Sequence, residues 1–135
     1  MGFKGIHHFC IQTSTYKETL HFYTEILDFE LVKEDIYVPK RAYKAWLKSG
    51  DLLIEVLTPK CSKPFKDYDK LNHGITHFSL LVDDAHEELK NLKSKGFRNF
   101  KPKHGEIIYK IKGGYQFKLL APEGTEIEVR DSEEI

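Results

Sequence analysis

The chain has 135 residues, of which 40% are hydrophobic and 13% aromatic. This is enough for one domain with its own core and excludes disorder as the main state. The charges of its 21 basic and 21 acidic residues cancel. No apolar run approaches the ~20 residues of a membrane span, and we find no apolar signal segment at the amino terminus. We therefore expect a cytoplasmic protein with neither a nucleic acid nor a membrane as partner.

The first part of the chain predicts a strand, a helix and then three strands. Residues 4–12 alternate in polarity, which places His8 and Cys10 on one face and Ile11 on the other. Thr15, followed three residues later by Glu18, predicts a capping box that opens a helix running to Leu27. The strand-like stretches that follow are residues 30–38, 43–48 and 52–58.

The second part repeats this order. Residues 75–83 read as a strand, Asp84 as a helix N-cap with Glu87 three residues on, and Gly96 as the helix stop. Further strands are expected at about 107–112, 115–121 and 125–130, with a hairpin turn at Gly113-Gly114. Cys10 and Cys61 form no Cys-x-x-Cys motif, so neither a disulfide framework nor a zinc–thiolate site is expected.

Three matches at nearly constant offset indicate an internal repeat. Residues 6–11 (IHHFCI) match 75–80 (ITHFSL) at an offset of 69, the Ile-Glu-Val at 54–56 matches 127–129 at 73, and Asp28-Phe29 matches Gly96-Phe97 at 68. We predict a single domain over 1–135. It consists of module one at about 1–60, a connector at 61–73 and module two at about 74–131.

The repeat predicts one polar cleft with four candidate metal ligands. His8 and His77 occupy equivalent places in the first strand of each module, and Glu55 and Glu128 in the last strand of each. Two imidazoles and two carboxylates suit one divalent ion such as Ni, Co, Zn, Mn or Fe, and leave positions open for substrate. Taken singly, a strand histidine is more often a surface or core residue. His7 is expected on the helix side, as a structural residue or a neighbour of the site.

The sequence resembles the vicinal-oxygen-chelate superfamily, which includes the glyoxalase and bleomycin-resistance proteins. The resemblance covers nearly the whole chain and rests on the two histidine strands and the segments Phe22-Tyr23, Leu27-Asp28-Phe29, 53–56, 82–84 and 122–128. It departs at Asp28 and Ala121, where the family usually has Gly and Asp. The resemblance implies an α+β fold of two paired βαβββ modules that form a curved mixed sheet around a metal-binding cleft. It also implies metal ligands at His8, Glu55, His77 and Glu128.

The resemblance is closest to glyoxalase I, the lactoylglutathione lyase. It implies an isomerase that converts a 2-oxoaldehyde thiohemiacetal of glutathione or another thiol into a 2-hydroxyacyl thioester. The proton would move by way of a metal-held enediolate, with Glu128 as the leading candidate base and Glu55 placed symmetrically opposite. A homodimer is expected on the same resemblance. Two alternatives stay open: an enzyme like methylmalonyl-CoA epimerase, and a non-catalytic protein that binds a small molecule in the same cleft.

Overall fold

A computed structural model describes residues 2–36, 41–60, 65–67, 69 and 71–135. The chain divides into two compact units, Met1–Lys66 and Asp67–Ile135, and one predicted module falls in each. Cys61 and the last residues of the predicted strand 30–38 lie outside the described residues.

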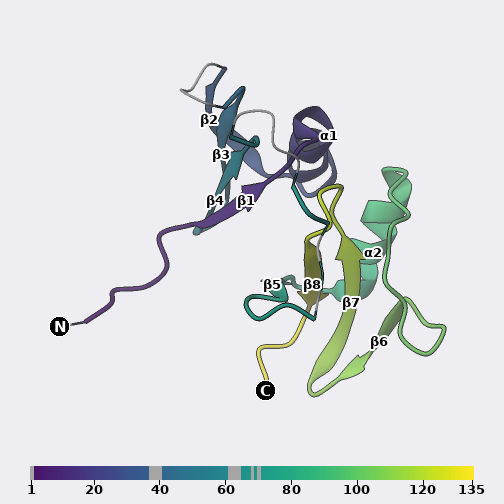
Figure 1. Cartoon of the computed structure of the whole chain (residues 1–135). Helices are drawn as coiled ribbons and strands as arrows, with labels where there is room; N and C mark the ends of the chain where they lie inside the picture. Colours follow the sequence, from purple (N-terminus) through teal and green to yellow (C-terminus); the bar gives the residue numbers. More distant parts are fainter. Residues whose placement is uncertain (1, 37–40, 61–64, 68, 70) are drawn as a thin grey trace. The chain divides into compact units, whose positions relative to one another are not determined.

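The first unit contains a four-stranded mixed sheet with the order β1-β4-β3-β2. Its elements are β1 (Phe9–Gln12), α1 (Tyr16–His21), the π-helical segment η1 (Phe22–Ile26), β2 (Glu30–Asp35), β3 (Lys44–Ser49) and β4 (Leu52–Leu57) (Figure 1). β1 is parallel to β4, whereas β3 is antiparallel to both of its neighbours. Alternate residues of β3 and β4 are buried, as expected of strands with one apolar face.

The predicted capping box at Thr15 is wrong. The Thr15 side chain accepts no capping hydrogen bond. Instead, the buried Thr13 hydroxyl accepts from the Thr15 backbone N–H at 3.0 Å and lies 2.9 Å from the Thr19 hydroxyl. Thr13 takes over the turn because the chain leaves β1 at that point and directs this side chain into the interior.

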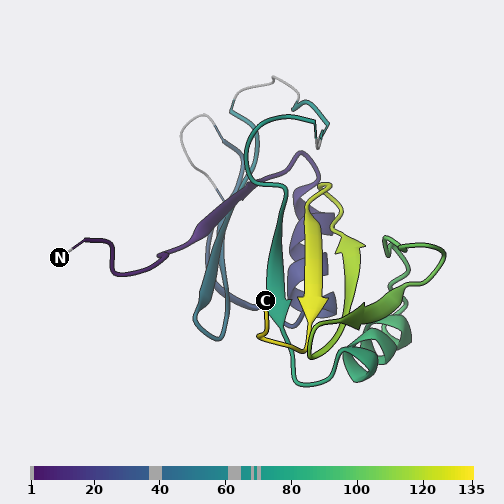
Figure 2. The ribbon, with the colours of Figure 1, turned by 90° about the horizontal axis from the view of Figure 1, so that it is seen from below.

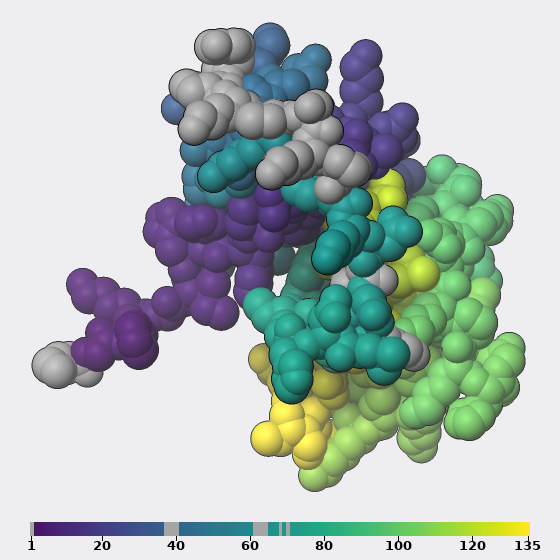
Figure 3. Space-filling model, viewed as in Figure 1, coloured from purple at the N-terminus to yellow at the C-terminus, as the bar shows by residue number. Residues whose placement is uncertain are grey.

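The first strand is shorter than predicted, since regular pairing begins at Phe9 and not at residue 4. Phe9 lies opposite Ile54, and β4 itself begins at Leu52. Residues 2–6 therefore lie beyond the end of β4 in this register. They run away from its sheet (Figure 1) and form the purple arm that projects in the space-filling view (Figure 3).

The second unit repeats the arrangement, with strand order β5-β8-β7-β6. Its elements are β5 (His77–Leu81), α2 (Ala85–Ser94), β6 (Ile108–Ile111), β7 (Gly114–Leu120) and β8 (Glu126–Arg130). β5 is parallel to β8, and the strands lie side by side in Figure 2. Helix α2 contacts β6 and β7 and buries Ala85, Leu89 and Leu92.

Both predicted ends of α2 are confirmed. The Asp84 carboxylate accepts hydrogen bonds from the backbone N–H groups of His86 (2.9 Å) and Glu87 (3.1 Å). Gly96 has a φ of +86° at the other end, a left-handed conformation that stops the helix. Asp28, its repeat equivalent in the first unit, has a φ of +60°, so a left-handed residue follows the helical segment in both units.

The α+β fold class is confirmed, with two βαβββ modules that each carry a four-stranded mixed sheet. No helix in the described part of the chain is long and apolar enough to cross a membrane.

Candidate functional site

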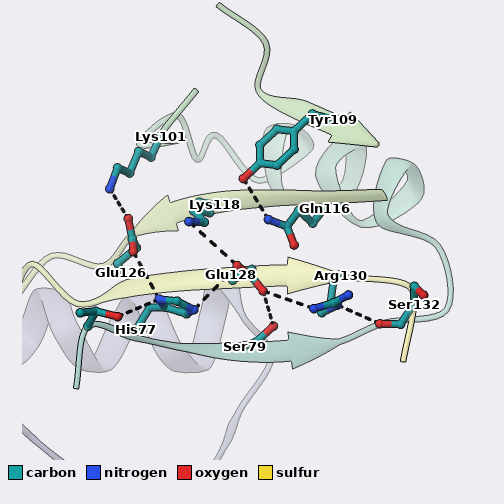
Figure 4. Close-up of polar contacts among 11 residues, drawn as sticks. His77, Ser79, Lys101, Tyr109, Gln116, Lys118, Glu126, Glu128, Arg130 and Ser132 are labelled. Atoms are coloured by element: carbon teal, nitrogen blue, oxygen red, sulfur yellow. Dashed lines mark hydrogen bonds and ion pairs between the residues drawn. The ribbon is translucent and has the colours of Figure 1, made fainter. Parts of the chain in front are cut away.

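The candidate site of the second unit pairs His77 with Glu128 on adjacent strands (Figure 4). His77 opens β5, and Glu128 lies in the middle of β8, the strand that runs parallel to β5. The imidazole Nε2 is 3.8 Å from the carboxylate Oε2. Glu128 is only 8% exposed, so this carboxylate is held in place rather than free in solvent.

Three further side chains surround the Glu128 carboxylate. Ser79 donates a hydrogen bond to Oε1 at 3.1 Å, Arg130 Nη1 lies 3.8 Å from the same oxygen, and Lys118 Nζ lies 4.0 Å from Oε2. A buried carboxylate needs hydrogen-bond or charge partners, and these three groups provide them for Glu128. They also give this face positive charge that an anionic ligand could use.

The second edge of the His77 ring faces other partners. Its Nδ1 is 3.1 Å from the Thr76 hydroxyl and 3.7 Å from Glu126 Oε2. Burial alone would raise the pKa of Glu126, but a hydrogen bond and the charge of Lys101, helped by Lys118 and His77, lower it below the ordinary value of 4.5. Glu126 is therefore an anion beside Nδ1.

In the first unit, Glu55 lies at the corresponding place in β4. The strand register pairs Cys10 with Glu55 and Ser79 with Glu128, each two residues after its histidine. The structure thus supports the equivalence of the two Glu positions that was predicted from the repeat. Glu55 Oε2 is 3.3 Å from Lys44 Nζ, and its side chain is 15% exposed.

Cys10 shares the face of Glu55 and contacts its carboxylate. Partial burial raises the pKa of the Cys10 thiol to about 11, and the hydrogen bond to Glu55 and the Glu55 charge add to the increase. The thiol is therefore protonated at neutral pH and is a poor nucleophile or metal ligand.

His8 precedes β1 and is exposed. Its ring meets the Trp46 ring edge-on, with 4.9 Å between centroids, and Trp46 lies directly opposite Glu55 in the strand register. His8 and Glu55 therefore both lie beside Trp46. His7 was expected on the helix side, but it is exposed and its Nδ1 is 2.8 Å from the His8 Nδ1. The predicted alternation fails here because His7 lies before the regular strand.

Sequence reasoning missed the charged and aromatic side chains around His77 and Glu128 and around His8 and Glu55. Alternation within the strands could have found them, since residues two apart share a face. On that basis Lys44 and Trp46 belong with Glu55 by cross-strand register, and Lys118 and Arg130 with Glu128. Lys101 could not have been found this way, because it lies outside the named strands.

The His77–Glu128 pair fits a divalent cation in donor type and spacing. Metal–ligand bonds of about 2.0–2.2 Å bring neighbouring ligand atoms to roughly 3 Å, so the observed 3.8 Å needs only a small side-chain movement. Among the residues that the structure describes, no three His, Cys, Asp or Glu side chains form a metal-binding group. One predicted His and one predicted Glu lie in each unit, and the four-ligand centre stays a prediction.

The sequence model of the Glyoxalase/Bleomycin resistance protein/Dioxygenase superfamily matches residues 5–129. None of the curated proteins matches the chain. Among solved structures, a glyoxalase family protein from Enterococcus faecalis is 25% identical, with a TM-score of 0.75 over 97% of this chain and 100% of that one.

Two further solved structures have the same fold at lower identity. A lactoylglutathione lyase from Agrobacterium tumefaciens is 17% identical, with a TM-score of 0.66 over 96% of this chain and 94% of that one. A variant of a fosfomycin resistance protein from Listeria monocytogenes, in complex with Mn(II), is 13% identical. Its TM-score is 0.69 over 98% of this chain and 94% of that one. These relatives differ in their named activities, so their likeness establishes the fold and not one reaction.

Proposed function

Since the chain belongs to the glyoxalase/bleomycin resistance protein/dioxygenase superfamily, we propose that it is a metal-dependent isomerase of the glyoxalase I type. The observation that carries this proposal is the His77 Nε2 lying 3.8 Å from the buried Glu128 carboxylate. His8 and Glu55 occupy the repeat-equivalent places in the first unit. The donors are those that a divalent ion takes, and a positioned carboxylate is a common general base.

His8, Glu55, His77 and Glu128 would be the ligands of one divalent ion, of the Ni, Co, Zn, Mn or Fe type. When bound, such an ion would act as a Lewis acid toward two neighbouring substrate oxygens. The ligands could come from one chain or from two chains of a homodimer. Light scattering of the purified protein measures its molar mass and so distinguishes a monomer from a homodimer. The glutathione adduct that is the proposed substrate forms in a reducing compartment, in keeping with a cytoplasmic location.

Glu128 is the proposed base. Its carboxylate would take the proton from the carbon that carries sulfur in the thiohemiacetal, and an enediolate would form. The proton would then return to the neighbouring carbon. The product is a 2-hydroxyacyl thioester with the same atoms as the substrate. Ser79, Arg130 and Lys118 would keep the carboxylate aimed, since all three contact it at 3.1 to 4.0 Å.

Turnover of the Glu128→Gln variant tests this proposal. The amide keeps the size and one oxygen of the carboxylate but cannot accept the proton, so we expect a ~10²- to 10⁴-fold lower rate with methylglyoxal–glutathione hemithioacetal. Protein loaded in turn with Ni, Co, Zn and Mn is compared with an equally loaded Glu25→Gln control, which removes an exposed carboxylate of α1–η1. An unchanged rate in Glu128→Gln would contradict the assignment of the base.

Metal binding is measured separately. The chain has one tryptophan, and Trp46 lies beside His8, so a paramagnetic ion such as Ni or Co at this site should quench its fluorescence. The Glu55→Ala and His77→Ala variants should bind the ion more weakly. Equal affinity in both variants would rule out the proposed ligand set.

One observation favours a second candidate, a metal-free protein that binds an anionic small molecule. Glu55 has an ion pair with Lys44, and Glu128 lies near Lys118 and Arg130, so both carboxylates have cationic partners without a metal. Absence of metal binding in the titration would support this candidate. Bound metal with activity only on a racemising acyl-CoA would indicate an epimerase.

A further inference from the structure

We propose that His7 and Thr76 are positioning residues that hold Nδ1 of the next histidine and so leave Nε2 available to a ligand. This inference rests on the proposed function, in which His8 and His77 bind a metal. It adds two residues to that site, and neither of them is a metal ligand.

The same contact occurs in both units. His7 Nδ1 lies 2.8 Å from His8 Nδ1, and Thr76 Oγ1 lies 3.1 Å from His77 Nδ1. His7 and Thr76 are repeat equivalents, since each directly precedes its histidine in the matching segments 6–11 and 75–80. The contact is therefore part of the repeat, although the chemical group that makes it differs.

Such a contact between adjacent residues is unusual for a strand. Successive side chains of a regular strand point to opposite faces, so a residue does not normally reach its neighbour's ring. His7 and His8 precede β1, and Thr76 precedes β5, which begins at His77. The irregular backbone before each strand lets the two side chains meet.

The hydrogen bond matters because a neutral imidazole has one N–H and one lone pair. If Nδ1 carries the hydrogen and donates it, the lone pair is on Nε2. In the first unit, His7 Nδ1 would accept this hydrogen. In the second, the Thr76 hydroxyl would accept it, and the Glu126 carboxylate 3.7 Å away favours a proton at the same nitrogen.

The opposite edge of His77 is where the lone pair is needed. Nε2 faces Glu128 Oε2 at 3.8 Å, and Figure 4 shows the ring between Glu126 on one side and Glu128 on the other. Histidines that bind metals commonly donate their second N–H to a protein group, and loss of that group typically costs 10- to 100-fold in metal affinity. His7 and Thr76 provide such groups.

The first test reads the tautomers without metal or substrate. Long-range ¹H–¹⁵N spectra of the metal-free protein, at about pH 8.5 where an ordinary imidazole is neutral, should show the Nδ1–H form for His8 and His77. Thr76→Val keeps the shape but removes the hydroxyl, and it should shift His77 toward the Nε2–H form. Thr76→Ser should restore the parent spectrum, and His7→Phe should shift His8 alone.

The second test measures affinity for Ni or Zn by calorimetry. Thr76→Val and His7→Phe should each bind roughly 10- to 100-fold more weakly, whereas Thr76→Ser and a control, His21→Phe on the exposed side of α1, should match the parent. Parent-like tautomers in Thr76→Val and His7→Phe, or equal losses in the Ser and Val variants, would overturn the inference. If no metal binds, the proposed function fails, and the tautomer spectra alone decide this inference.

Discussion

Asp131 connects three elements of the second unit and is the clearest target for a stability experiment. It directly follows the end of β8, the strand that carries Glu128. Its Oδ2 accepts a hydrogen bond from the Ala85 N–H at the start of α2 (2.9 Å), and its Oδ1 accepts from the Tyr115 N–H in β7 (2.7 Å). Replacing Asp131 by Asn keeps the shape and removes the charge and one acceptor oxygen.

The expected cost is about 1.5–3 kcal/mol of unfolding free energy. In the variant an amide NH₂ faces one of the two backbone N–H groups, so one hydrogen bond to a charged group is lost, and such a bond is worth about 1.5–3 kcal/mol. The lost negative charge beside the start of α2 adds about 0.3–1 kcal/mol at low ionic strength. Partial exposure of the carboxylate favours the lower half of the range.

The effect should depend on pH with a defined sign. The hydrogen bonds from Ala85 and Tyr115 lower the pKa of Asp131 below its ordinary value of 3.8. A lowered pKa stabilises the fold above the unfolded-state value, and this stability is lost as the pH falls through the folded-state value. The parent should therefore exceed the variant by a constant amount above about pH 5, and the difference should shrink progressively below pH 3.8.

Urea unfolding followed by circular dichroism at pH 7, 5, 4 and 3 measures this difference. Asp83→Asn is the matched control, because it removes an exposed charge near the same end of α2. A variant as stable as the parent at pH 7, or a difference that persists unchanged to pH 3, would refute the reasoning.

Three other substitutions test single contacts by the same unfolding assay. Gly114→Ala should cost about 1–3 kcal/mol, because the new Cβ would clash with Asp131 Oδ1; parent-like stability would contradict that close approach. Gly96→Ala should cost about 1–2 kcal/mol, the strain of a left-handed residue at a φ of +86°, and no loss would mean that the helix end rearranges freely. Tyr16→Phe should cost about 1 kcal/mol, because the hydroxyl donates a 2.9 Å hydrogen bond to Glu34. A neutral result would show that water replaces this bond.

Much of the architecture was predictable because local patterns and the repeat agree. The apolar alternation of residues 52–58 and the Asp84 cap correspond to β4 and the start of α2, since both depend on residues close in sequence. The Thr15 capping box failed because the buried Thr13 hydroxyl accepts from the Thr15 backbone N–H, the group that the Glu18 side chain would bond in such a box. A one-dimensional pattern does not contain this competition.

The length of β1 also depends on tertiary structure. Residues 4–8 have the pattern of a strand, but a strand exists only where a neighbour supplies hydrogen bonds, and β4 begins at Leu52. The partner strand, and not the pattern, decides where β1 starts. The exposure of His7 and its contact with His8 follow from this.

By itself, the sequence determined the order of elements, the repeat and the equivalence of His8 with His77 and of Glu55 with Glu128. These properties depend on spacing along the chain, and the strand register agrees with them. Alternation places Lys118 and Arg130 on the same face as Glu128, but only the tertiary structure decided which side chains reach the carboxylates. Lys101 reaches Glu126 from outside the strands, and Arg130 and Lys118 reach Glu128. The direction of a long side chain depends on the packing around it, and spacing along the sequence does not specify that direction.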